Sequence, residues 1–236
     1  MRKRRYSSLL KPSLQHHLAA SGGSSSKPRA KSKASMMMQQ YLAEGSGESV
    51  PIPLCHNIVS TSQILTTLKE INLQRLASLF PFTTYDRKRF AAITIRLAHP
   101  HCTCLLFGSG KLVITGSTSF HACLVASQTI TEMLREVNPR DRFEVVSCVI
   151  QNIVAHVELK QGQRIDLEAL YSKFCEYSTY QKTIFPGLVL RPPDSPIVLL
   201  VFKSGRVVCT GGKSYDDIYL GFMHMFKILQ GYIYTD

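Results

Sequence analysis

LLFGSGKLVITG at residues 105–116 returns as LVFKSGRVVCTG at residues 200–211, at a constant spacing of 95 residues. Positions outside this stretch keep the same spacing, in the pairs Asn57 and Asn152, Val59 and Val154, Phe90 and Phe185, and Arg96 and Arg191. Repeats of solenoids and propellers are roughly 20–50 residues long, so a repeat of this length is half of a domain. We therefore expect two similar halves related by a pseudo-twofold axis.

The same order of elements is expected in both halves. Each half begins with a short strand, followed by a helix that Asn72 or Asp166 caps at its start. Three strands and a long closing helix come next, with tight turns at Ser109-Gly110 and Ser204-Gly205. The elements are expected at 55–61, 71–80, 89–97, 102–109, 111–117 and 119–137 in the first half, and at 149–157, 165–174, 184–191, 196–204, 206–212 and 214–232 in the second.

Side-chain alternation separates the expected strands into two faces. Helices are expected to cover the face that contains Ile93, Ile95, Leu97, Leu106, Leu112 and Ile114. The closing helix of the first half is expected to pack on it through Leu124, Ile130, Met133, Leu134 and Val137, which recur near helical spacing.

The opposite face of the sheet is unusual because it is also apolar. It contains Leu105, Phe107, Val113 and Thr115 in the first half, and Leu200, Phe202, Val208 and Thr210 in the second. A solvated face of an antiparallel sheet is normally polar, whereas this one is bordered by Arg96, Lys111, Arg191 and Arg206. The pattern predicts a surface for an apolar and anionic partner, and a groove of duplex DNA, which has near-twofold symmetry, fits that description.

The charge of the chain supports an anionic partner. Its net charge is +12 and its pI is near 9.5, which favours nucleic acid or an anionic membrane surface. Residues 1–50 hold +7 of this charge, are rich in Ser, Gly and Lys, and are predicted to be a disordered tail whose basic clusters at 2–5 and 27–33 resemble nuclear localisation signals. The two repeats are then expected at 51–140 and 141–236.

Other classes of protein find little support in the sequence. The seven cysteines are odd in number and mostly lie in apolar runs, which favours reduced, buried thiols in an intracellular protein. No run reaches the roughly 18 apolar residues of a membrane span. HPHCTC at residues 99–104 lacks a second Cys/His cluster at a standard spacing, so a strand start is favoured over a zinc site. No catalytic set or cofactor motif recurs, and we expect neither an enzyme nor a cofactor.

The repeated residues resemble a known family. The doubled pattern NIVST, RFAA and LLFGSGKLVITG, followed by QNIVA, IFPGLVLR and VLLVFKSGRVVCTGG, is similar to the core of the TATA-box-binding protein family over residues 54 to about 232. The resemblance implies an α+β fold, a pseudo-twofold saddle of two β-α-β-β-β-β-α repeats. Its curved sheet would have ten antiparallel strands, with four helices on the convex face and DNA on the concave face.

The resemblance also implies roles for particular residues. Paired phenylalanines would intercalate at the two ends of a DNA site: Phe90 and Phe107, and Phe185 and Phe202. The floor of the minor groove would meet Asn57, Val59, Leu105, Val113, Thr115, Asn152, Val154, Leu200, Val208 and Thr210. Phosphates would be held by Arg89, Arg96, Ser109, Lys111, Arg191, Ser204, Arg206 and Lys213. A kink of about 80° in duplex DNA is a known property of this same family, and the resemblance, not the residue pattern, supplies that value.

The sequence departs from the family pattern at the loop implied to meet transcription factor IIB. Acidic residues are usual there, whereas this chain has Tyr180, Gln181, Lys182 and Thr183. Thr118 also stands where the second half has Lys213, so one phosphate contact is in doubt. These changes indicate a divergent member or a related factor with altered partners.

The leading interpretation is a nuclear general transcription initiation factor. It would bind A·T-rich promoter DNA in the minor groove and nucleate a preinitiation complex. Its partners would be factors like transcription factors IIB and IIA, TATA-binding-protein-associated factors and RNA polymerase machinery. The alternative is a related module whose concave face binds a protein or RNA, since aromatic strand faces also stack single-stranded RNA.

Overall fold

Two long strands lie side by side at the centre of the sheet. The computed structural model describes residues 50–193 and 195–235, and in it β1 (Leu54–Thr66) pairs antiparallel with β6 (Phe143–Glu158). Both strands are longer than predicted. The alternation continues beyond the expected ends: Ile64 is fully buried near the end of β1, and Phe143 is buried at the start of β6.

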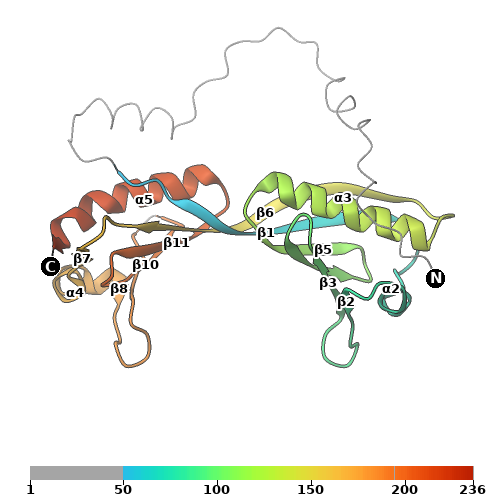
Figure 1. Cartoon of the computed structure of the whole chain (residues 1–236), viewed down its shortest axis with the longest axis horizontal. Coiled ribbons are helices and arrows are strands. Elements are labelled where there is room, and N and C mark those ends of the chain that lie inside the picture. The colour runs from blue at the N-terminus through green and yellow to red at the C-terminus, as the bar shows by residue number, and fades with distance from the viewer. Residues whose placement is uncertain (1–49, 194, 236) are drawn as a thin grey trace, which may run out of the picture. The chain divides into compact units, whose positions relative to one another are not determined.

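Ten antiparallel strands form one sheet, in the order β2-β3-β4-β5-β1-β6-β11-β10-β9-β8 (Figure 1). The flanking strands of the first half are β2 (Thr83–Thr84), β3 (Ala92–Leu97), β4 (Cys102–Phe107) and β5 (Lys111–Ser117). Those of the second half are β8 (Ser178–Thr179), β9 (Leu188–Leu190), β10 (Val198–Val201) and β11 (Arg206–Gly212). The order runs outward from β1 and β6 in mirror fashion, as the 95-residue repeat predicts.

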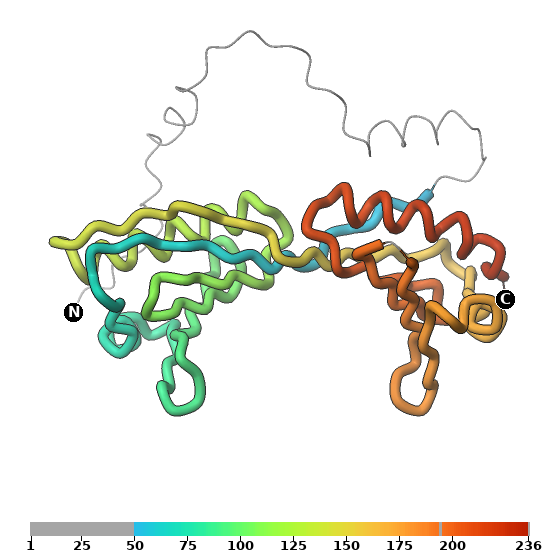
Figure 2. Tube along the Cα trace, turned by 180° about the vertical axis from the view of Figure 1, so that it is seen from behind, coloured from blue at the N-terminus to red at the C-terminus, as the bar shows by residue number. Residues whose placement is uncertain are grey.

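Four α-helices are present among the described residues: α2 (Leu73–Leu79), α3 (Phe120–Val137), α4 (Leu167–Phe174) and α5 (Tyr215–Leu229). The predicted caps are confirmed, because the Asn72 side chain accepts from the Arg75 N–H and Asp166 accepts from the Glu168 and Ala169 N–H groups. α3 and α5 lie on one side of the sheet, whereas loops 85–91 and 180–187 project on the other side in both views (Figures 1 and 2).

One part of the predicted helix packing is wrong. Ile130, Met133, Leu134 and Val137 are buried beneath α3, but Leu124 is 36% exposed. The buried positions of this turn are instead taken by Cys123, Ala126 and Ser127, because small side chains let the helix lie close to the sheet. Ser127 also closes a buried hydrogen bond of 2.7 Å between its Oγ and that of Ser62 on β1.

A second, small sheet was not predicted from the sequence. β7 (Gln163–Ile165) pairs antiparallel with β12 (Ile233–Thr235), and short 3₁₀ turns at Cys175–Tyr177 and Gln230–Tyr232 follow α4 and α5. The pairing places the end of the described chain against the strand that leads into α4. It gives the second half a closure that the first half lacks among the described residues.

The core lies between the sheet and the helices. All six strand residues predicted for the covered face are buried, and Phe222 of α5 is the largest fully buried side chain. The fold class is therefore confirmed as an α+β saddle of two repeats, and the described residues belong to one compact unit. The predicted tail at 1–50 lies outside the described residues except for Val50, and the repeat boundaries remain predictions.

Glycines with positive φ turn the chain at equivalent places in the two halves. Gly110 and Gly205 have φ of 82° and 85°, and their N–H groups donate to the carbonyl oxygens of Phe107 and Phe202 at 3.0 Å each. These are the two predicted hairpin turns. A left-handed conformation costs little at glycine because it has no Cβ.

Gly211 and Gly116 form a matched pair for a stability test. Both have positive φ, but a Cβ on Gly211 would lie 2.2 Å from the Pro196 carbonyl oxygen, whereas one on Gly116 would meet nothing closer than 3.6 Å. We expect Gly116→Ala to cost about 1 kcal/mol of unfolding free energy from backbone strain alone. Gly211→Ala should cost about 1–3 kcal/mol more, because backbone must also move. Urea unfolding measures both, and equal losses would contradict the assigned clash.

The described cysteines are all free thiols, and most are buried as predicted. Burial raises the pKa of the Cys209 thiol to about 12, whereas Cys175 is exposed. The raised pKa means that at pH 8 only roughly one Cys209 in ten thousand is a thiolate, and this fraction grows only as the pH rises toward 12. Iodoacetamide at pH 8 should modify Cys175 while Cys209 stays unmodified for at least about a hundredfold longer, as followed by peptide mass spectrometry. Modification of both at one rate would show that the second-half core is open.

Candidate nucleic-acid interface

The face of the sheet opposite to α3 and α5 is uncovered by any described helix, and we call it the open face. Its side chains are partly buried and alternate along each strand with fully buried ones. Cross-strand pairing joins them into continuous rows, such as Leu105 with Val113 and Leu200 with Val208. The floor residues predicted from the sequence all lie on this face: Asn57, Val59, Leu105, Val113, Thr115, Asn152, Val154, Leu200, Val208 and Thr210.

Two pairs of phenylalanines stand at equivalent places in the two halves. Phe90 contacts Phe107 edge to face with ring centroids 5.8 Å apart, and Phe185 contacts Phe202 at 5.6 Å. Phe90 is 49% exposed although it is a large apolar side chain. The backbone N–H of Phe90 donates to the Asp86 carbonyl and that of Phe185 to the Gln181 carbonyl, so both loops hold their aromatic ring in the same way.

The two asparagines are fixed by matching hydrogen bonds. Asn57 Oδ1 accepts from the Gly116 N–H at 2.7 Å, and Asn152 Oδ1 accepts from the Gly211 N–H at 2.8 Å. A bond to a backbone donor identifies this atom as the oxygen, so the amide nitrogen is at the other position. Asn152 Nδ2 also donates to Thr210 Oγ1 at 3.1 Å. The arrangement presents amide N–H donors at the centre of the open face.

Cationic and hydroxyl side chains surround the open face. The eight residues predicted to hold phosphates are all exposed: Arg89, Arg96, Ser109, Lys111, Arg191, Ser204, Arg206 and Lys213. Arg96 and Arg191 are placed by equivalent backbone bonds, from their N–H groups to the carbonyls of Phe82 and Tyr177. Arg206 Nη1 lies 3.8 Å from Glu158 Oε1, so this cation is partly neutralised.

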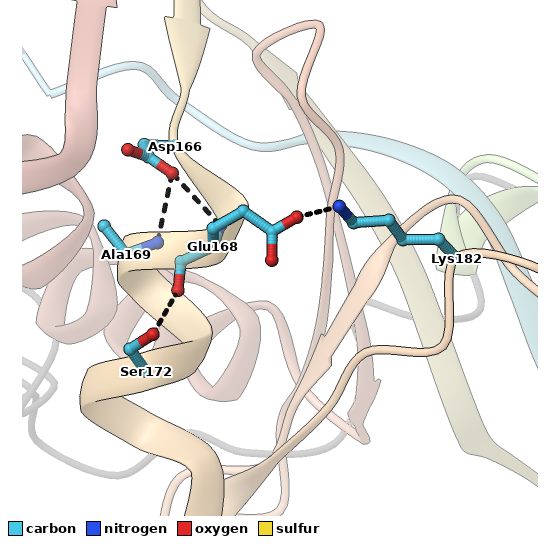
Figure 3. A network of polar contacts seen from close by, with 5 residues as sticks. All are labelled: Asp166, Glu168, Ala169, Ser172 and Lys182. Atoms are coloured by element: carbon cyan, nitrogen blue, oxygen red, sulfur yellow. Dashed lines mark hydrogen bonds and ion pairs between the residues drawn. The ribbon is translucent and has the colours of Figure 1, made fainter.

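The altered loop of the second half contacts α4 (Figure 3). Lys182 Nζ forms an ion pair with Glu168 and lies 5.6 Å from the Tyr180 ring centroid. The Glu168 carboxylate raises the pKa of Lys182. Gln181, Lys182 and Thr183 are exposed and Tyr180 is partly buried, so the predicted partner loop shows a basic and polar surface.

Sequence reasoning missed several residues of the open face. Thr94 and Val189 lie opposite Leu105 and Leu200, and Thr103 and Val198 lie opposite Thr115 and Thr210. Both pairs keep the 95-residue spacing and alternate with buried neighbours, so the same pattern identifies them. Ile184, next to Phe185, is 79% exposed and was also missed. An exposed isoleucine in a loop has no strand alternation to reveal it.

The HPHCTC stretch at residues 99–104 contains the start of a strand. Cys102 and Cys104 open β4, as expected for HPHCTC, and their sulfur atoms lie 3.9 Å apart. Among the described residues no group of three or more His, Cys, Asp or Glu side chains is arranged to hold a metal ion. No helix in the described ranges is long and apolar enough to cross a membrane.

Comparison with known proteins covers most of the chain. Residues 53–137 and 147–232 each match the family described as transcription factor TFIID, or TATA-binding protein. The chain belongs to the TATA-binding protein family. The two matched ranges correspond to the two structural repeats, so each half carries the family pattern by itself.

Relatives in the TATA-binding protein family are identical to this chain at about one aligned residue in three. The chain is 34% identical to TATA box-binding protein-like 2 of Rattus norvegicus over 77% of this chain, and 35% identical to the TATA-box-binding protein of Dictyostelium discoideum over 77%. The matched part spans 51% of the rat protein and 85% of the Dictyostelium protein, so this chain covers only about half the length of some relatives.

A solved structure of the TATA-binding protein family has the same fold. The Methanococcus jannaschii TBP aligns with a TM-score of 0.63 and 28% identity, covering 77% of this chain and 99% of that one. The saddle is therefore retained in a chain whose sequence has diverged from the family elsewhere.

Proposed function

We propose that this protein is a general transcription initiation factor that binds the minor groove of TATA-like, A·T-rich promoter DNA and kinks it. The observation that best supports this proposal is the two edge-to-face phenylalanine pairs, which lie at equivalent ends of one apolar open face. Their ring centroids are 5.8 and 5.6 Å apart. Phe90 is exposed and Phe185 is partly buried, and aromatic rings at both ends of the face suit insertion between base steps. Unstacking costs a few kcal/mol per step, and a bent duplex that covers more protein surface offsets this cost.

The chemistry of the open face favours A·T over G·C pairs. In the minor groove A·T and T·A pairs present only acceptors, whereas G·C adds the guanine amino donor. The amide donors of Asn57 and Asn152 match the acceptors, and the Val and Leu side chains of the floor offer the guanine amino group no acceptor. The exposed cations around the face would add salt-dependent binding to phosphates.

The test is a fluorescence-transfer bending assay with the full chain and an end-labelled A·T-rich duplex, compared with a duplex of the same length in which the element is G·C. Binding with a large bend on the A·T duplex alone is expected. Equal binding to both duplexes, or binding without a bend, would refute the kinking proposal. A single-stranded RNA competitor that displaces the duplex at equal concentration would favour RNA as the natural partner of the open face.

The same proposal includes a non-enzymatic role in the nucleus within a preinitiation complex. The partners would be factors like transcription factors IIB and IIA, TATA-binding-protein-associated factors and the RNA polymerase machinery. The Lys182–Glu168 ion pair gives the loop at 180–183 a charge distribution unlike the acidic family pattern. A partner of this loop should therefore carry fewer basic residues than the family pattern implies.

A further inference from the structure

Two histidines contact each other on the open face of the second half. The rings of His56 on β1 and His156 on β6 meet edge to face, with centroids 5.7 Å apart and an interplanar angle of 83°. His156 alternates along β6 with the buried Ala155 and Val157, which places it in the same row as Val154. His56 is exposed.

A bulge aims His56 at this position. Cys55 pairs with Ala155 and Asn57 with Val154, so His56 is the extra residue of β1 between them. Bulges re-aim a side chain and are frequent next to functional sites. His56 is therefore turned toward the open face by the backbone and does not follow the regular alternation of β1.

The first half has the same bulge with different chemistry. Val59 pairs with Asn152 and Ser60 with Ile150, so Gln151 is the extra residue of β6. Its Nε2 donates to Thr61 Oγ1 at 2.8 Å. Gln151 is 95 residues from His56, and Thr61 is 95 residues from His156. A Gln–Thr pair and a His–His pair thus occupy pseudosymmetric positions beside the two asparagines.

The histidine pair is incompletely satisfied within the protein. His156 Nδ1 is buried and has no hydrogen-bond partner among the described residues, whereas buried polar atoms are normally paired. The charged neighbours on the strands packed against the pair are Glu158 on β6 and Arg206 on β11, which lie 3.8 Å apart from each other. The other strand neighbours are Leu54, Asn57, Val154 and Val208, none of which is charged.

We propose that the His56–His156 pair makes the second half of the open face more selective for A·T pairs than the first half. This difference would set the direction in which the protein binds an asymmetric DNA site. This inference rests on the proposed minor-groove function. The narrow groove of A·T runs has an enhanced negative potential that attracts inserted histidine. Imidazole rings bring N–H donors to it.

By the same reasoning, the first half of the open face tolerates G·C pairs better than the second half does. One of the two N–H groups of Gln151 Nε2 is engaged with Thr61, and the amide oxygen of Gln151 offers a ligand an acceptor. An amide oxygen accepts a hydrogen bond, and the guanine amino group is the one donor on the minor-groove floor. A G·C pair is therefore accommodated better beneath the Gln151–Thr61 pair than beneath the two histidines.

Orientation is measured by fluorescence transfer from a donor dye on Cys175, which is exposed and lies in the second half, to an acceptor at one end of the duplex. The duplex is an A·T element with one G·C pair on one side of its centre. The full chain should place its second half on the uniform A·T side with a bias on the order of fivefold, the lower range for one specific base contact. A palindromic A·T element is the control and should give equal populations.

The matched variant His56→Gln/His156→Thr copies the first half into the second. It should lower the bias to about one while binding to the palindromic element persists. Adding Gln151→His and Thr61→His to that variant should reverse the bias, and this reversal separates the proposal from a mere loss of folding. An unchanged bias in the first variant would overturn the inference alone. Absence of any complex between the wild-type chain and A·T DNA would overturn the proposed function and this inference with it.

Discussion

Joint replacement of Phe90 and Phe185 by alanine should abolish the bend in A·T-rich DNA and lower affinity by about a hundredfold. Stacking of a base on an aromatic ring contributes about 1–3 kcal/mol, so loss of two rings removes about 2–6 kcal/mol, and the hundredfold loss corresponds to about 2.7 kcal/mol within this range. The change lies at both ends of the open face, and each remaining ring, Phe107 or Phe202, loses its edge-to-face partner. Bending and affinity are both read from the fluorescence-transfer titration.

A matched control is available for this variant. Phe82 and Tyr177 are also separated by 95 residues and are 40% and 43% exposed. Phe82 packs on Phe80 with ring centroids 5.6 Å apart and not on the intercalating pair. Phe82→Ala/Tyr177→Ala therefore removes two exposed aromatic rings outside the intercalating pairs and should retain most of the bend. Equal losses in the two double variants would show that the effect is nonspecific.

Joint replacement of Asn57 and Asn152 by aspartate should weaken binding to the A·T duplex almost as much, by about a hundredfold. Each aspartate keeps the oxygen that accepts from the Gly116 or Gly211 N–H, so local structure should persist. It replaces the amide donor by a second oxygen, which faces a minor groove lined with acceptors and leaves both sides unpaired. Such a loss costs about 1–3 kcal/mol at each position, and the added charge opposes the phosphates.

Asn72→Asp is the control for the added charge. Asn72 caps α2 away from the open face, and the equivalent cap of α4 is already an aspartate, Asp166. The variant should therefore fold and bind like the wild type. Thermal unfolding should give similar midpoints for the wild type, Asn72→Asp and Asn57→Asp/Asn152→Asp. If the double aspartate variant binds with wild-type affinity, the asparagines do not donate to the groove.

The sequence predicted more of the covered face than of the open one. Residues such as Ile93, Leu106 and Ile114 were identified correctly because burial imposes a period of two on each strand. The caps at Asn72 and Asp166 were also predictable, because a cap depends on residues within one helical turn. The prediction that Leu124 is buried was wrong because near-helical spacing marks an apolar stripe on the helix, but it does not show that small residues occupy the side closest to the sheet.

Parts of the open face could not be predicted from alternation alone. Ile184 lies in a loop, where no periodic pattern applies. His56 and Gln151 lie at bulges, where one extra residue interrupts the pairing of β1 with β6. The role of each bulge depends on the partner strand, which is about a hundred residues away in the chain.

The two repeats, the order of their main strands and long helices, and the apolar character of both sheet faces can be predicted from the amino-acid sequence, whereas the short strands β2, β7, β8 and β12 were missed by the residue pattern. These properties follow from local periodicity and from a spacing of 95 residues that is visible without coordinates. Tertiary structure alone decided which atoms meet across strands: the Asn57 oxygen with the Gly116 N–H, and the His56 ring with the His156 ring. Such contacts depend on where bulges shift the pairing of β1 with β5 and β6, and each shift involves strands that are far apart in the chain.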